Sequence, residues 1–348
     1  IEVAEELING EYPEINSELG CASGLPNLTN KKIEFIYADH RANPEVARTE
    51  AERLIKEEKV VALIGAYHSS ATKTASQVAE EHKVPFLAGS SSSASLTARG
   101  YNYFCRIAPD DDMETEFFFE YIKYLNKCFD ANIKTIGTVY IDNEYGIHAS
   151  EMVDKWMDEK YGAEGFEKTV EVRYSEDMEN IGEGIKKIKE ASPDVIFQAS
   201  YIEDVTRFVR NYKEKNIVPK AVLNYCGGFQ DPLFIDNLGE DGNYFSGSSA
   251  SMPSIFASSK SEFKISELYR EKTVSIVFDS MFCDVIDVLK TKEFNTPYFI
   301  SKCVKFNEKG QNVKPISFMV QIQNSSYEVV WPLNIQEKLP QILGAEHD

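Results

Sequence analysis

The chain has 348 residues, and its 56 Asp and Glu outnumber its 37 Lys and Arg, which gives a formal net charge of −19. This acidity argues against a nucleic-acid partner, because phosphate binding requires clustered basic side chains. An apolar content of 43% is typical of a globular protein, and no run approaches the ~20 apolar residues needed to cross a bilayer. A chain of this length is expected to form two lobes.

Catalytic and metal-binding patterns are missing from the sequence. The six cysteines show no C-x-x-C spacing, and the motifs of nucleotide-binding proteins and zinc proteases are absent. His68 beside Ser69 suggests a nucleophile and its base, but neighbours on one turn rarely reach hydrogen-bonding geometry. We therefore expect a protein that is not an enzyme and needs no metal or cofactor; a hydrolase is the least favoured alternative.

The first elements in chain order predict an α/β protein. Residues 1–9 predict a helix, 33–38 a strand, and 44–58 an amphipathic helix with Pro44 in its opening turn. Two continuous apolar runs follow, at 60–65 and 84–88. Such runs predict parallel strands that are covered on both faces.

Each of these two strands leads into a serine-rich loop. Ser69 and Ser70 precede a helix predicted over 71–81, and four serines at 90–93 precede a possible helical turn. Ligands of such sheets bind at the carboxyl ends of strands, where hydroxyls and helix amides suit a small anion such as a carboxylate. Alternatively, the serines cap their own helices or form a solvated loop.

An acidic run, Asp110 to Asp112, leads from the first half of the chain into a helix predicted over 113–129. It is typical of a crossing between lobes, with Asp112 as the N-cap; three solvated loop acids are the alternative.

The second half repeats the alternation of strands and helices. Two such arrays imply two doubly wound lobes with a ligand cleft between them. The predicted strands are 133–141, 170–174, 194–199 and 221–225, and the predicted helices are 146–161, 181–191 and 203–214.

Aromatic residues follow three strand ends of the second array. Tyr145, Tyr201 and Phe229 would form walls opposite the serine loops, and the alternative for each is core packing.

Four stretches together resemble a known family. They are 61–70, the strand at 84–86 with its serine loop, the crossing at 107–109, and 140–146. The chain resembles the branched-chain amino-acid-binding proteins of ABC importers, which are type I periplasmic binding proteins. The resemblance extends over nearly the whole chain, to Val329-Val330-Trp331-Pro332.

The resemblance implies roles for individual residues. Ser69 matches the carboxylate-binding serine, and Ser90 and Ser92 match positions that take the ammonium and the carboxylate. Tyr145 and Tyr201 match aromatic residues that close over the ligand. The expected ligand-binding set is Tyr67, His68, Ser69, Ser70, Ser90, Ser91, Ser92, Asp142, Tyr145, Tyr201, Gly227, Gly228 and Phe229.

The chain departs from the family near Gly227 and Gly228. Amino-acid-binding members carry there an acidic residue that pairs with the ligand's ammonium, and an unpaired buried ammonium is unfavourable. Either Asp142, Glu203 or Asp231 substitutes, or the ligand lacks an α-amino group. The expected ligand class is therefore an amino acid or a related small carboxylate, amide or aromatic acid.

The resemblance also implies the organisation of the molecule. Lobe 1 is expected to comprise 1–110 and 250–303, and lobe 2 to comprise 111–249 and 304–348. The family's first strand and part of the region 270–304 are lacking, so we expect that the given chain omits segments, including a signal peptide and a lipid-bearing cysteine.

The function implied is that of a monomeric extracytoplasmic solute-binding protein, secreted or lipid-anchored, that delivers its ligand to an ABC transporter permease. A ligand-sensing domain of the same fold that signals to a partner protein is the alternative.

Overall fold

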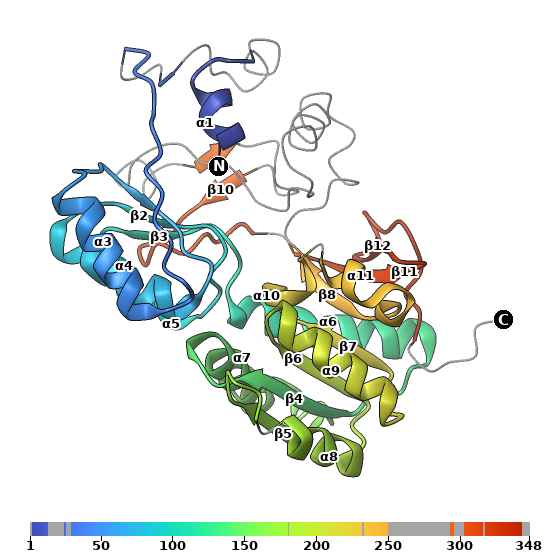
Figure 1. Cartoon of the computed structure of the whole chain (residues 1–348). Coiled ribbons are helices and arrows are strands. Elements are labelled where there is room, and N and C mark those ends of the chain that lie inside the picture. Colours follow the sequence, from blue (N-terminus) through green and yellow to red (C-terminus); the bar gives the residue numbers. More distant parts are fainter. Residues whose placement is uncertain are drawn as a thin grey trace.

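The computed structural model describes two lobes, each built around its own sheet (Figure 1). The residues described are 2–12, 24–25, 29–179, 181–231, 233–249, 293–295, 303–315 and 317–342. The region 250–292, which contains most of the second expected segment of lobe 1, lies outside them.

Lobe 1 contains a short parallel sheet of order β1-β2-β3. The strands are β1 (Leu63–Ile64), β2 (Phe86–Ala88) and β3 (Phe104–Arg106). Its helices are α1 (Glu2–Ile8), α3 (Pro44–Lys56), α4 (Ser69–His82) and α5 (Ser95–Ala98). The small residues Ala47 and Ala51 of α3 and Ala71 and Ala75 of α4 are buried, which lets the two helices pack closely beside the sheet.

The C-terminal part of the chain returns to lobe 1. β9 (Glu293–Asn295) pairs antiparallel with β10 (Cys303–Lys305), which lies beside the blue elements of lobe 1 in Figure 1. Val304 and Phe306 pack with Cys105 and Ile107 in one buried cluster. The expected assignment of 304–348 to lobe 2 stays a prediction, but its first residues contact lobe 1.

Lobe 2 contains a seven-stranded sheet of order β12-β11-β8-β7-β6-β4-β5. The pairs from β5 to β8 are parallel, and β11 and β12 are added antiparallel at one edge. The strands are β4 (Thr135–Ile141), β5 (Glu167–Tyr174), β6 (Val195–Ala199), β7 (Ala221–Asn224), β8 (Ser246–Ser249), β11 (Phe318–Gln323) and β12 (Ser326–Trp331).

Helices cover this second sheet. They are α6 (Asp111–Phe129), α7 (Glu144–Trp156) with a π-helical extension (Met157–Tyr161), α8 (Ile181–Ala191), α9 (Ile202–Glu214), α10 (Cys226–Phe229), α11 (Leu233–Leu238) and a 3₁₀ turn (Gly239–Gly242). The predicted alternation in this half of the chain is confirmed, with boundaries shifted by a few residues.

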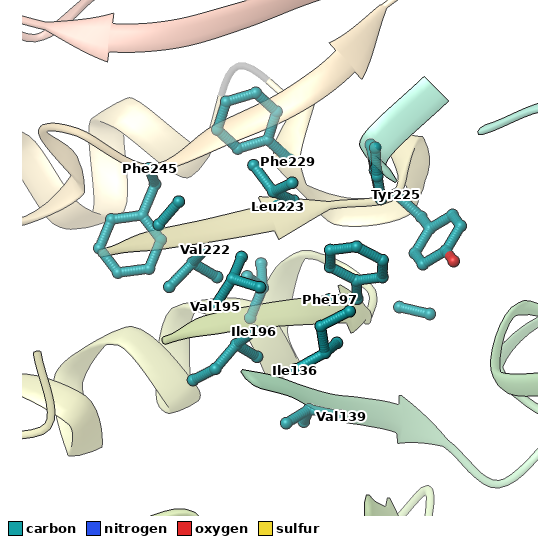
Figure 2. Close-up of a cluster of buried hydrophobic side chains, with 14 of the residues drawn as sticks. Ile136, Val139, Val195, Ile196, Phe197, Val222, Leu223, Tyr225, Phe229 and Phe245 are labelled. Atoms are coloured by element: carbon teal, nitrogen blue, oxygen red, sulfur yellow. The ribbon is translucent and has the colours of Figure 1, made fainter. Parts of the chain in front are cut away.

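The core of lobe 2 lies along its central strands. Figure 2 shows side chains of β4, β6 and β7 packed together, among them Ile136, Phe197 and Leu223, all fully buried. Strands covered on both faces read as apolar runs. This explains why sequence alone predicted them well.

Three predictions about local structure are wrong. The apolar run 60–65 is not a strand covered on both faces, because only Leu63–Ile64 form a strand and Val61 and Ile64 are 88% and 51% exposed. Residues 33–38 form no strand, and the backbone N–H and C=O of Ile33 pair instead with the side chain of Asn9, at 2.9 and 2.8 Å. The N-cap of α6 is Asp110 and not Asp112: the Asp110 carboxylate accepts the Met113 amide at 3.0 Å.

Candidate functional site

The two serine loops of lobe 1 lie against each other. The Ser69 hydroxyl accepts the Ser93 amide at 3.3 Å, and the Ser91 hydroxyl donates to the Ala66 carbonyl at 2.8 Å. Ser91 also lies 2.6 Å from the hydroxyl of Thr72, on the first turn of α4. His68 is the N-cap of α4 but its side chain caps no amide, so the N-terminus of this helix lies beside the second loop without a side-chain cap from His68.

A buried arginine holds the second serine loop in place. The guanidinium of Arg106, at the end of β3, donates to the Ser93 carbonyl at 2.5 Å and the Ser91 carbonyl at 3.3 Å. It also pairs with Asp110 at 3.0 Å and with Gln311 at 2.8 Å, and it is fully buried. Ser91 to Ser93 are buried as well, so this run is an anchored loop and not a flexible, solvated one.

Asp111 lies on the other side of the same loop. Its amide donates to the Ser92 carbonyl at 2.9 Å, and its side chain is fully buried. Neither carboxylate oxygen has a partner in hydrogen-bond geometry among the described residues, although the Ser92 hydroxyl lies near enough to favour the charged form. Burial outweighs that effect and the charge of Arg106, and raises the pKa of Asp111 to about 7.

A cluster of five rings spans the two lobes. His40, Tyr67 and His68 come from the lobe 1 side, and Tyr145 and Tyr201 come from lobe 2. The ring of His68 lies 4.6 Å from that of Tyr201, and Tyr201 lies 5.4 Å from Tyr145. Tyr67 and His68 directly precede Ser69, which places this ring cluster beside the serine loops.

Glycines make room for the tyrosines. A Cβ atom on Gly227 would lie 2.7 Å from the hydroxyl oxygen of Tyr145, and one on Gly228 would lie 2.6 Å from the backbone carbonyl carbon of Tyr201. No side chain fits at either position with the tyrosines where they are. At this turn, where the resemblance implied an acidic residue, the two glycines leave space for the ring of Tyr145 and the backbone at Tyr201.

Polar contacts also connect the lobes. Glu144, at the start of α7, accepts hydrogen bonds from Lys73 of α4 at 2.7 Å and from Ser95 of α5 at 2.5 Å. Burial raises the pKa of Glu144, but these hydrogen bonds outweigh it and hold the pKa below its ordinary value. The Tyr67 hydroxyl donates to the carbonyl of Gly227 across the same boundary.

Some predicted site residues lie apart from this constellation. Phe229 is fully buried in the core of lobe 2, where its ring lies 5.3 Å from Phe234 (Figure 2). Asp142 pairs with Arg173 on the surface. Of the two further acids considered as ammonium partners, Asp231 caps the Leu233 amide at 2.9 Å, and Glu203 is exposed.

The structure therefore brings together most of the predicted residues and adds two. Tyr67, His68, Ser69, Ser91, Ser92, Tyr145, Tyr201, Gly227 and Gly228 lie in the connected region described above. For Ser70 and Ser90 no contact with it is described, and their roles stay predictions. Sequence reasoning missed Arg106 and Asp111; a charged residue inside the apolar run 104–108 was the available signal for Arg106.

Metal-binding and membrane-spanning features were sought in the described ranges. Within them, no three His, Cys, Asp or Glu side chains are grouped so as to hold a metal ion. No helix in that part of the chain combines the length and the apolar character that a membrane span requires.

Comparison with known proteins identifies relatives of the chain. A family model described as "Periplasmic binding protein" matches residues 19–271. Leu/Ile/Val-binding protein homolog 8 of Brucella abortus is 27% identical over 227 residues, which are 64% of this chain and 54% of the relative. Homolog 7 of the same organism is 25% identical over 220 residues, 62% of this chain and 53% of that protein. The chain thus spans about half the length of these relatives.

Solved structures share the fold. The leucine-binding protein LivK of Thermotoga maritima superposes with a TM-score of 0.72 at 18% identity and 94% coverage of both chains. The branched-chain amino acid transporter substrate-binding protein LivJ of Streptococcus pneumoniae, in complex with isoleucine, gives 0.70 at 17% identity, with 95% of this chain and 94% of that one covered. The expected two-lobed type I periplasmic binding protein fold is confirmed.

Proposed function

Because the chain belongs to the periplasmic binding protein family, we propose that it captures an α-amino acid between its lobes and delivers it to the permease of an ABC importer. The family also supports an extracytoplasmic location. Delivery rests on the family alone, and stimulation of the ATPase of a cognate importer by the loaded protein would test it.

The observation that carries the choice of an α-amino acid is the position of Asp111. The serine loop lies between two features of opposite character: Ser93 contacts Ser69 at the N-terminus of α4, and Ser92 contacts Asp111. A helix N-terminus with hydroxyls favours a carboxylate, and a buried carboxylate favours an ammonium. A zwitterion placed across the loop satisfies both.

Asp111 supplies the negative charge that the glycines at 227 and 228 cannot. The carbonyls of Ser91, Ser92 and Ser93 already accept hydrogen bonds, from Arg106 and from the Asp111 amide. The Asp111 carboxylate is therefore the better acceptor for a ligand ammonium.

Calorimetric titration of amino acids and their deaminated analogues tests this proposal. For the amino acid that most stabilises the protein in a thermal-shift screen, we expect Asp111→Asn to weaken binding about 10- to 150-fold, the equivalent of ~1.5–3 kcal/mol for a hydrogen bond to a charged group. The deaminated analogue should bind both proteins equally. The matched control is Asp112→Asn, because Asp112 is only half-buried and pairs with Lys155 at 2.8 Å.

The pH dependence of binding is a second arm of the same experiment. Since the pKa of Asp111 is raised from 3.8 to about 7, the folded, ligand-free protein holds a proton there that the unfolded chain has lost. The contribution of Asp111 to the free energy of unfolding therefore decreases as the pH rises from about 4 to about 7. The ligand ammonium favours the ionised form, so affinity should rise with pH up to about 7 in the wild type and less steeply in Asp111→Asn. Tighter binding of deaminated acids than of amino acids would contradict the proposal.

A further inference from the structure

His68 lies at the centre of the ring cluster. Its imidazole is 4.6 Å from the ring of Tyr201, 5.3 Å from Tyr67 and 5.4 Å from His40, measured between centroids. It therefore touches rings of both lobes. It also directly precedes Ser69, the residue expected to hold the carboxylate, so a ligand's side chain leaving the serine loop would meet this imidazole.

The Nδ1 atom of His68 is buried and has no hydrogen-bond partner among the described residues. The side chain does not cap α4 either, although it stands at the N-cap position. Buried polar atoms in folded proteins are almost always paired with protein, water or ligand. The neighbours that the structure describes around this imidazole include the rings of His40, Tyr67 and Tyr201, and a bound ligand would offer Nδ1 the partner that the described residues do not.

The electrostatics of the ring cluster define the charge of that partner. Burial lowers the pKa of His68 and the neighbouring His40 lowers it further, whereas Glu176 acts in the opposite direction. The imidazole is therefore neutral at pH 7, and a neutral imidazole both donates and accepts hydrogen bonds. A carboxylate on the ligand's side chain would meet a neutral ring and the negative charge of Glu176. An uncharged hydroxyl or amide meets no such opposition.

We infer that the ligand's side chain ends in an uncharged hydrogen-bonding group, a hydroxyl or an amide, which Nδ1 of His68 recognises between the rings of Tyr67 and Tyr201. This inference rests on the proposed function and narrows its ligand class. It separates this chain from the relatives whose names refer to leucine, isoleucine and valine, because those side chains offer nothing to an imidazole nitrogen.

Two pairs of amino acids of nearly equal shape make the test sharp. Asparagine and leucine differ in replacing an amide by methyl groups, and threonine and valine differ in a hydroxyl. Calorimetric titration of the full chain with all four should show the polar member of the tighter-binding pair favoured at least tenfold. A site built to hydrogen-bond a polar group rejects the apolar isostere because its own polar atom is left unpaired.

Substitutions of His68 test whether the preference for the polar amino acid depends on Nδ1. His68→Phe keeps a ring in the cluster and should reduce the preference to within twofold, while His68→Asn, whose amide nitrogen can occupy the place of Nδ1, should restore part of it. His82→Phe, at the exposed far end of the same helix, is the control and should leave the preference unchanged. Thermal melts of each variant check that it folds.

The possible outcomes separate this inference from the proposed function. Binding of leucine or valine as tight as that of its polar partner overturns the inference and leaves an amino-acid-binding protein. An unchanged preference in a folded His68→Phe variant also overturns it. If no α-amino acid binds, the proposed function fails, and the inference fails with it.

Discussion

The two lobes contribute to the site in different ways. Lobe 1 offers hydroxyls, helix amides and the serine loop, and one buried arginine holds this loop through the carbonyls of Ser91 and Ser93. Lobe 2 offers tyrosine rings: Gly227 leaves space for the ring of Tyr145, and Gly228 leaves space for the backbone at Tyr201. The hydrogen bonds that hold the serine loop of lobe 1 are formed without a ligand, whereas the tyrosine rings of lobe 2 contribute an apolar surface. Under the proposed function, lobe 1 orients the carboxylate of the ligand, and lobe 2 supplies Asp111 for the ammonium and the rings that cover the ligand.

We expect the largest effect on stability from a substitution in the polar network of lobe 1. Arg106→Gln removes a buried charge from beside Asp110, Asp111 and the serine loop, and should lower the free energy of unfolding by about 3–5 kcal/mol, as for other buried ion pairs that lose one partner. Urea denaturation measures it. Arg48→Gln, which removes an exposed charge 3.7 Å from Glu52, is the control and should stay within ~0.5 kcal/mol of the wild type. Equal stability of the two variants would show that Arg106 does not organise the loop.

A smaller effect should follow from disturbing the lobe 2 half. The new Cβ of Gly228→Ala would lie 2.6–2.8 Å from backbone atoms of Ser200, Tyr201 and Ile202, which cannot move as a flexible side chain would. Overpacking of this kind destabilises by about 1–3 kcal/mol, and it should also displace Tyr201 and weaken ligand binding. Gly182→Ala, in α8 with no atom within 4 Å of its Cβ, is the matched control and should be neutral or stabilising. Unchanged affinity in Gly228→Ala would mean that Tyr201 does not cover the ligand.

The smallest effect concerns the contact between the halves. Glu144→Gln weakens the bridge to Lys73 and Ser95, and because the Lys73 side chain is 48% exposed, the pair is screened by solvent. We expect ligand affinity to fall about 1.5- to 5-fold through faster dissociation, which stopped-flow measurements would detect. Glu183→Gln, which removes an exposed bridge to Lys187 within α8, should leave dissociation unchanged. A dissociation rate that is unchanged in Glu144→Gln would show that this bridge does not help to hold the lobes closed.

The sequence predicts those features that depend on neighbouring residues better than those that depend on residues far apart in the chain. The strands of lobe 2 are apolar runs that local pattern predicts, and the serine loops follow two such runs. Residues 33–38 have the same local pattern, yet Asn9 takes the backbone groups of Ile33. Asp110, Asp111 and Asp112 are three residues of the same type in one run. Only the tertiary structure makes Asp110 a helix cap, Asp111 a buried carboxylate and Asp112 the partner of Lys155.

The buried arginine also has a consequence for the order of folding. Arg106 bonds Gln311 across 205 residues of sequence, and the amide of Arg106 donates to the carbonyl of Gly310. At about 5–20 residues per second, a ribosome needs roughly 10–40 s to make that intervening chain. During that interval the serine loop lacks part of the network that fixes its anchor, so this network is completed only after Gly310 and Gln311 have been made.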